Sequence, residues 1–144
     1  DEVGMVLQPQ NTRDPHFICC CCGCCCGVLS TAKKLPRPAE VFDTNYLAVV
    51  DPELCTECGT CSDRCQMDAI TYLDGVASVE ENRCIGCGLC VTTCPDEAIV
   101  LAERPETKVP PATVMELYRT MMLERFGPLG AVKILGKKAL GMKI

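Results

Sequence analysis

Cysteine is the residue type in this sequence that could do chemistry, and its spacing concentrates that chemistry in three short segments. The chain of 144 residues holds 15 cysteines and one histidine, His16. The cysteines fall within residues 19–26, 55–65 and 84–94. An odd number excludes complete internal disulfide pairing, and thiols three residues apart are placed to converge on one centre. The pattern therefore predicts that thiolates bind metal.

The second and third segments repeat one cysteine spacing with an offset of 29 residues. The two runs are Cys55, Cys58, Cys61 and Cys65, and Cys84, Cys87, Cys90 and Cys94. Three thiolates at intervals of three residues can wrap three corners of an iron–sulfur cubane, and neighbouring glycines let the backbone approach its sulfides. The fourth cysteine sits on a following helical turn and cannot easily curl back to its own loop, so we expect it to serve the other centre. Two zinc sites are the alternative, but pairs of C-x2-C knuckles would leave the additional cysteine of each run unexplained.

With Pro95 after Cys94, the two runs resemble those of the bacterial-type dicluster ferredoxin family over roughly residues 45–103. The resemblance implies two [4Fe–4S] clusters in an α+β module with two-fold pseudo-symmetry, small β-hairpins and short helices. It also implies one cluster on Cys55, Cys58, Cys61 and Cys94, and another on Cys84, Cys87, Cys90 and Cys65. Gln66 departs from the family pattern, which has proline after the fourth cysteine, but this change removes no ligand.

Residues 19–26 hold seven further cysteines in eight positions. One interpretation is a third metal centre, either iron–sulfur or structural zinc, and the other is a packed or redox-labile group of free thiols. Neighbours in an extended stretch point to opposite faces, so only three or four of the thiols can converge. We expect Cys21, Cys22, Cys24 and Cys25 to bind metal, with the segment folded back against the dicluster module.

Short elements should position these cysteines. Asp74-Gly75 predicts a tight hairpin between strands at residues 70–73 and 76–79, and residues 47–50 and 99–101 can pair as a second set of strands. The residues around 61–65 and 90–94 can each form a helical turn. Thr113 and Glu116 predict a capping box at the start of a helix that Gly127-Pro128 ends. Beyond it, three glycines make any helix in residues 129–144 marginal.

These elements suggest three parts. Residues 1–38 form a Cys-rich N-terminal segment and linker, which we expect to be the end of an upstream domain. Residues 39–107 form the dicluster module, and residues 108–144 form a C-terminal helical extension. With three Phe, three Tyr and no Trp, the chain has few large side chains for a core, so bound metal must supplement it.

Charge separates the tail from the rest of the chain. Residues 1–107 carry 7 basic and 17 acidic side chains, whereas residues 108–144 carry 7 basic and 2 acidic ones. The acidic part argues against a nucleic-acid partner, and the basic tail could make peripheral contact with a membrane surface. No apolar run is long enough for integral membrane insertion. Reduced thiolates predict a cytoplasmic, anaerobic setting.

Single-electron transfer is the function that these features favour. We expect the chain to be a carrier, or a relay domain of a larger redox protein, with redox proteins as its donors and acceptors. It shows no nucleophile–base pair, so no catalysis is expected from it alone. The alternative is a subunit of a catalytic oxidoreductase in which the cysteines of residues 19–26 form an additional active metal centre.

Overall fold

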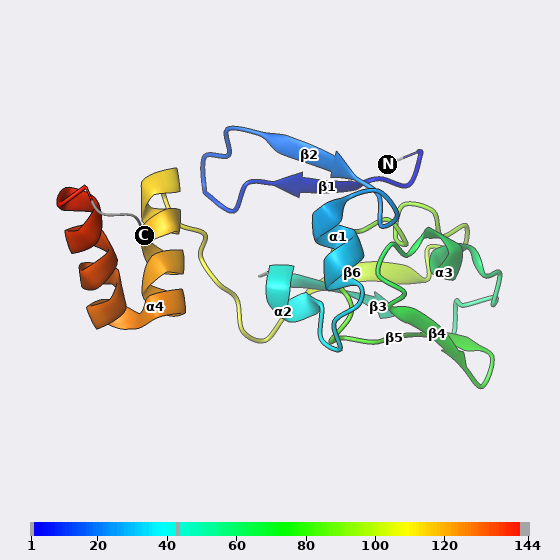
Figure 1. Cartoon of the computed structure of the whole chain (residues 1–144). Helices are drawn as coiled ribbons and strands as arrows, with labels where there is room; N and C mark the ends of the chain where they lie inside the picture. The colour runs from blue at the N-terminus through cyan, green and yellow to red at the C-terminus, as the bar shows by residue number, and fades with distance from the viewer. Residues whose placement is uncertain (1, 43, 142–144) are drawn as a thin grey trace. The chain divides into compact units, whose positions relative to one another are not determined.

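The computed structural model describes residues 2–42 and 44–141, which belong to two compact units. The first unit comprises Asp1–Gln8 and Ile18–Lys108, and the second comprises Pro9–Phe17 and Val109–Ile144. All 15 cysteines lie in the first unit. Short strands and short helices are mixed along the chain (Figure 1), as the predicted α+β class requires.

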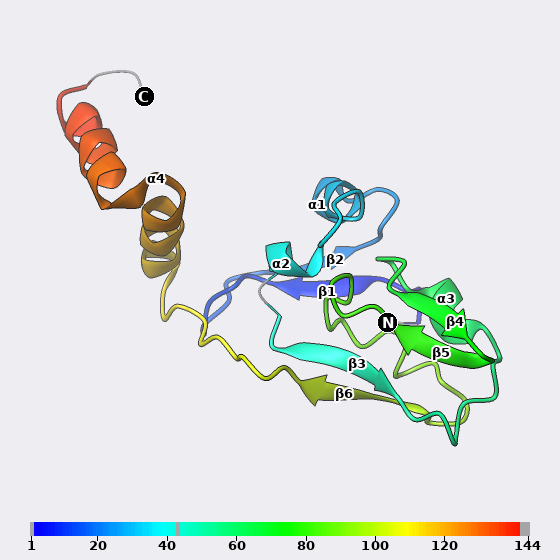
Figure 2. The ribbon, with the colours of Figure 1, turned by 90° about the horizontal axis from the view of Figure 1, so that it is seen from below.

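The elements of the first unit are short, and its strands pair in twos. The strands are β1 (Val6–Pro9), β2 (Ile18–Cys21), β3 (Tyr46–Val50), β4 (Ile70–Leu73), β5 (Val76–Val79) and β6 (Ile99–Glu103). The helices are α1 (Gly27–Ala32), α2 (Ala39–Phe42) and α3 (Thr60–Arg64). Strand β1 pairs with β2, β3 with β6, and β4 with β5. Figure 2 shows the last two pairs side by side.

Both strand pairs predicted from the sequence are confirmed. Strands β4 and β5 run antiparallel with Ile70 opposite Val79. The turn between them places Asp74 at φ 49° and Gly75 at φ 87°, the two left-handed residues that a type I′ hairpin requires. Strands β3 and β6 are also antiparallel, with Val50 opposite Ile99. The second pair joins the residues just before the first cysteine run to those just after the second.

The N-terminal cysteine segment packs into the same unit through α1. Leu29 on α1 is fully buried, and it shares the core with Val6 of β1 and with Met67, which follows the first cysteine run. Lys33, predicted to lie in a linker, forms an ion pair with Asp68 at 2.8 Å between Nζ and Oδ1. The segment is therefore held against the module by burial as well as by charge.

The core of the first unit is small and includes cysteine side chains. Cys61, Cys84 and Cys90 are buried beside Ile70, Ile99 and other aliphatic residues. Each of the three paired sheets has only two strands. Two-stranded sheets are only marginally stable by themselves in water. The stability of this unit must therefore depend in part on packing around the cysteines.

The second unit contains α4 (Val114–Ala139). Thr113 Oγ1 accepts the amide of Glu116 at 3.3 Å, as predicted. The Glu116 carboxylate, however, accepts the amide of Ala112 at 2.8 Å, one residue earlier than in a standard capping box. Gly127, at φ 67° and ψ 171°, breaks the helix as the sequence predicts, but the helix resumes at Pro128. Proline suits the first turn of a helix, where its missing N–H costs nothing, so Gly127-Pro128 is a kink and not an end.

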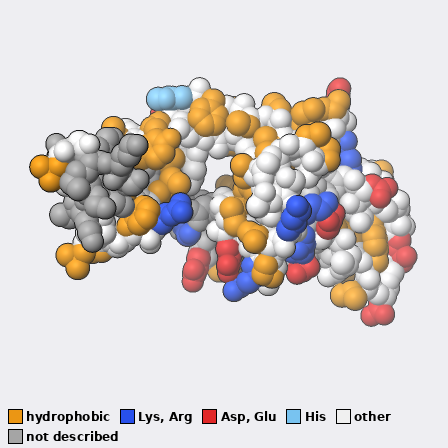
Figure 3. Space-filling model, viewed as in Figure 1, with side chains coloured by type: hydrophobic (Ala, Val, Ile, Leu, Met, Phe, Trp, Pro, Cys, Tyr) orange, Lys and Arg blue, Asp and Glu red, His pale blue; other side chains and the backbone are white. Residues whose placement is uncertain are grey.

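The surface of the first unit carries acidic side chains with lysines and arginines among them (Figure 3). None of the helices in the described part of the chain is long and apolar enough to cross a membrane.

Candidate metal centres

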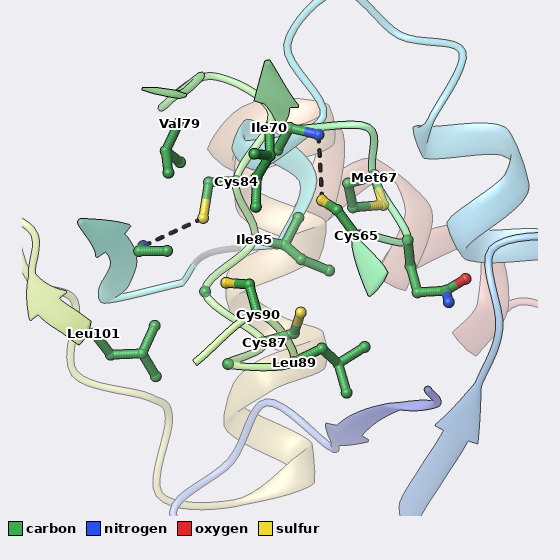
Figure 4. Close-up of a pocket in the computed structure, with 15 residues that line it drawn as sticks. Cys65, Met67, Ile70, Val79, Cys84, Ile85, Cys87, Leu89, Cys90 and Leu101 are labelled. Carbon is green, nitrogen blue, oxygen red and sulfur yellow. Dashed lines mark hydrogen bonds between the residues drawn. The ribbon is translucent and has the colours of Figure 1, made fainter. Parts of the chain in front are cut away.

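One cavity of the first unit is lined by cysteines from both runs. Three of them, Cys84, Cys87 and Cys90, come from the second run, and the fourth is Cys65, the last cysteine of the first run. The cavity encloses about 400 Å³ including its mouth. Most of the remaining lining is aliphatic, with Ile85, Leu89 and Leu101 among it. In Figure 4 the four cysteines lie around Ile85.

Backbone amides point at two of these sulfurs. Ala69 donates its N–H to Cys65 Sγ at 3.2 Å, and Ala48 of β3 donates to Cys84 Sγ at 3.5 Å. Such N–H···S bonds stabilise a negatively charged sulfur and tune the potential of an iron–sulfur centre. Burial, with the other cysteines nearby, raises the pKa of Cys90 to about 12. A positive ion in the cavity would reverse that effect.

A second cavity repeats this arrangement with the roles of the runs exchanged. It is lined by Cys55, Cys58 and Cys61 of the first run and by Cys94 of the second. The amide of Ala98 donates to Cys94 Sγ at 3.3 Å, as Ala69 does to Cys65. The lining is more polar than that of the first cavity, because it includes Thr56, Glu57, Tyr72 and Asp96.

Two hydroxyl groups touch sulfur in this second cavity. Tyr72 Oη lies 3.5 Å from Cys61 Sγ, and this contact with burial raises the pKa of Tyr72 to about 12. The thiol of Cys58 lies 3.5 Å from Thr60 Oγ1, and hydrogen bonds from Thr60 lower its pKa. Tyr72 lines the site, although the sequence indicated it only as part of a strand. Its position on β4, within the hairpin, gives no signal of contact with Cys61.

The loops that carry the cysteines share their backbone geometry at an offset of 29 residues. Left-handed residues occur in matching pairs: Glu57 and Gly86, Gly59 and Gly88, and Asp68 and Glu97. The amide of Ser62 bonds to the Gly59 carbonyl, and that of Val91 bonds to the Gly88 carbonyl. Two features of the backbone require glycine at position 86. Its φ is 65°, and a Cβ there would lie 2.4 Å from the Tyr46 carbonyl oxygen.

Two arginines fix the second run relative to its surroundings. Arg83 donates to the Met67 carbonyl at 2.8 Å and to the Lys33 carbonyl at 3.0 Å. Arg104 donates to the Cys84 carbonyl at 2.7 Å. The backbone next to Cys84 is thus tied to the backbone after Cys65, to the N-terminal segment and to the end of β6. Nothing local in the sequence indicates these contacts, since each joins segments that are distant along the chain.

The N-terminal cysteines split into two groups instead of forming one. The thiols of Cys22, Cys24 and Cys25 lie within 4.8 Å of one another. Cys21, the fourth residue of the predicted set, hydrogen-bonds with Cys26, and this contact raises the pKa of Cys21 to about 11. Hydrogen bonds from Cys24 and Cys25 lower the pKa of Cys22 to about 7. The segment is extended only as far as Cys21, and a turn follows, with the Cys26 amide bonded to the Cys22 carbonyl at 3.2 Å.

The donor sets of the two cavities fit an iron–sulfur cluster. Each cavity presents four reduced cysteines. Thiolate is the ligand that holds such clusters. Amides directed at sulfur occur in both cavities, and the first also has a mostly aliphatic lining; both features suit a protected redox centre.

Comparison with known proteins agrees with this chemistry. No curated protein is similar enough to the chain to count as a relative. Residues 48–105 match the family model described as a 4Fe-4S dicluster domain. This segment contains both cysteine runs, the hairpin of β4 and β5, and most of the β3–β6 pair. Residues 48–105 therefore form a 4Fe-4S dicluster domain of the ferredoxin type.

Proposed function

We propose that the chain relays single electrons through two [4Fe–4S] clusters held in crossed ligand sets. One set is Cys55, Cys58, Cys61 and Cys94, and the other is Cys84, Cys87, Cys90 and Cys65. The observation that carries the proposal is the exchange of the fourth cysteine between the two cavity linings. A bound cluster supplies a one-electron couple whose potential depends on the hydrogen bonds and polarity around it.

Pseudo-symmetry of the module follows from the same proposal. The matching left-handed residues and loop hydrogen bonds support two copies of one unit related by an approximate two-fold axis. A crossed arrangement also brings the two centres close together, because each run contributes to both. Short separation suits electron passage between them, with redox proteins as donor and acceptor at either end.

The experiment that tests the function is metal analysis of anaerobically purified protein combined with electron paramagnetic resonance. We expect about eight iron and eight sulfide per chain in the two ferredoxin sites. Reduction should bleach the brown colour and produce the signals of two interacting cubanes. Stoichiometric zinc without visible absorption would contradict the proposal, because zinc has no one-electron couple to offer.

Tyr72 should tune one of the two centres. Tyr72→Phe removes a hydroxyl that lies 3.5 Å from Cys61 Sγ and that would donate to this sulfur when it is a cluster-bound thiolate. Reduction adds negative charge, so loss of a donor should lower the potential of that cluster. The shift should be roughly tens of millivolts, which corresponds to a fraction of the free energy of a charge-assisted hydrogen bond. Protein-film voltammetry measures the shift. Tyr46→Phe, at an exposed position on β3, is the matched control and should leave both potentials unchanged. An equal shift in both variants, or a rise in Tyr72→Phe, would contradict this role.

A catalytic subunit is the second candidate function, and the grouped thiols of Cys22, Cys24 and Cys25 are the observation that favours it. In that case the dicluster module would supply electrons to an additional metal centre on the N-terminal segment. The two candidates differ in what metal that segment holds.

A further inference from the structure

Three thiols of the N-terminal segment are gathered by a turn. We define the thiol turn as residues 22–25. Cys24 Sγ lies 3.2 Å from Cys22 Sγ and 3.4 Å from Cys25 Sγ. The amide of Cys25 also points at Cys22 Sγ, at 3.4 Å. Metal-bound thiolates commonly accept such bonds. Among the residues that the structure describes, this is the group of three potential ligands that lie within 4.8 Å of one another.

Contacts with Gln66 of the dicluster module hold the thiol turn in place. Gly23 donates its N–H to Gln66 Oε1 at 2.7 Å, and Gln66 Nε2 donates to the Gly4 carbonyl at 3.0 Å. A Cβ on Gly23 would lie 2.7 Å from the Gln66 carbonyl oxygen, so only glycine fits there. Gln66 stands where the family pattern has proline, which has no side-chain amide to offer. Gln66, which replaces the proline of the family pattern, is therefore the residue that hydrogen-bonds to the thiol turn.

The spacing of the thiols distinguishes between kinds of metal centre. A tetrahedral zinc ion with Zn–S bonds of about 2.3 Å holds its thiolates about 3.8 Å apart. A cubane attaches each thiolate to a different iron, so its thiolates must lie farther apart than those that share one ion. The thiol spacing in the two ferredoxin runs can be compared with that in the thiol turn. Neither ferredoxin run includes three thiols within 4.8 Å of one another, whereas the thiol turn does.

We propose that Cys22, Cys24 and Cys25 form a mononuclear site for a soft cation such as Zn²⁺, and not a third cubane. Three protein thiolates leave one tetrahedral position for a further ligand. Cys24 and Cys25 are exposed and Cys22 is half-buried, so that position is accessible to a small ligand from solvent, such as a thiol. Cys21 does not belong to the site, because its thiol lies outside the group of three within 4.8 Å of one another. The proposal is independent of the electron-transfer function, since it concerns different cysteines.

The site is tested on anaerobically purified protein that retains its iron. The probes are Zn²⁺, counted by elemental analysis, and Cd²⁺, followed by the ultraviolet difference absorption of cadmium–thiolate bonds. We expect one ion per chain in addition to the iron. Zinc X-ray absorption of the unmodified protein should show sulfur ligands at about 2.3 Å. A first shell without sulfur would overturn the proposal without the need for any variant.

Substitutions then assign the ligands. Cys24→Ser and Cys25→Ser should each weaken Cd²⁺ binding by more than about 100-fold, which exceeds the usual effect of removing a supporting residue. Cys19→Ser and Cys20→Ser change exposed thiols of the same segment that lie outside the group, and these controls should bind Cd²⁺ normally. An iron content unchanged across all four variants shows that the dicluster module has folded.

Three results would overturn the site. The first is equal weakening in the control variants. The second is the absence of any stoichiometric ion in the unmodified protein. The third is about twelve iron per chain, falling to about eight in Cys24→Ser, which would identify a third cubane in place of a single ion.

Discussion

Cys65→Ser is expected to remove the cluster held by the second cysteine run while the first run keeps its own. The physical reason is the position of Cys65, whose sulfur lines the cavity of Cys84, Cys87 and Cys90 and accepts the amide of Ala69 at 3.2 Å. Serine is a harder and more basic ligand than thiolate and binds iron less well. Iron should fall from about eight to about four per chain.

Double variants distinguish crossed from local ligation. Removing two ligands of one cluster should cost no more than removing one, whereas ligands of different clusters should act independently. Cys65→Ser with Cys84→Ser should therefore keep about four irons, and Cys65→Ser with Cys55→Ser should lose nearly all of them. Cys19→Ser, which alters an exposed cysteine of the N-terminal segment, is the control. Equal iron in Cys65→Ser and in Cys65→Ser with Cys55→Ser would mean that each run closes on itself. That result would leave electron transfer in place but refute the crossed sets.

The sequence predicts the local elements of the module well because their signals are local. Asp74-Gly75 specifies the turn between β4 and β5. Cysteine spacing likewise fixes which residues can face a cluster, since three thiols three apart must lie on one loop. These features need only the conformational preferences of a few neighbouring residues.

The parts that the sequence does not predict depend on contacts between distant segments. Gln66 is a conspicuous substitution, but nothing in its neighbourhood indicates Gly23 as its partner, 43 residues away. The same holds for Arg83, which bonds to the Lys33 carbonyl. The expected metal set of Cys21, Cys22, Cys24 and Cys25 assumed alternating faces in an extended strand. The turn after Cys21 replaces that alternation with a different grouping.

Removal of iron should unfold the first unit. Cys61, Cys84 and Cys90 are core residues, and the largest fully buried aliphatic side chains are few, with Leu29, Met67 and Val6 among them. Without cluster bonds, three two-stranded sheets would have to persist on little apolar burial, which is marginal. Metal–thiolate bonds contribute ~10–16 kcal/mol to folding in small zinc domains, which matches or exceeds the ~5–15 kcal/mol stability of an ordinary domain. Loss of the clusters should therefore shift the unit to the unfolded state.

Hydrogen exchange before and after anaerobic chelation measures this effect at individual strands. We expect the amides of β3, β4, β5 and β6 to lose their protection together as iron is removed. Helix α4 belongs to the other unit and contains no cysteine, so it serves as the internal reference, and its exchange should change far less. Restoring iron and sulfide should restore protection, which separates unfolding from irreversible thiol damage. If the amides of β4 and β5 stay protected after complete loss of iron, these strands are stable without the clusters. The clusters would then contribute little to the stability of the fold.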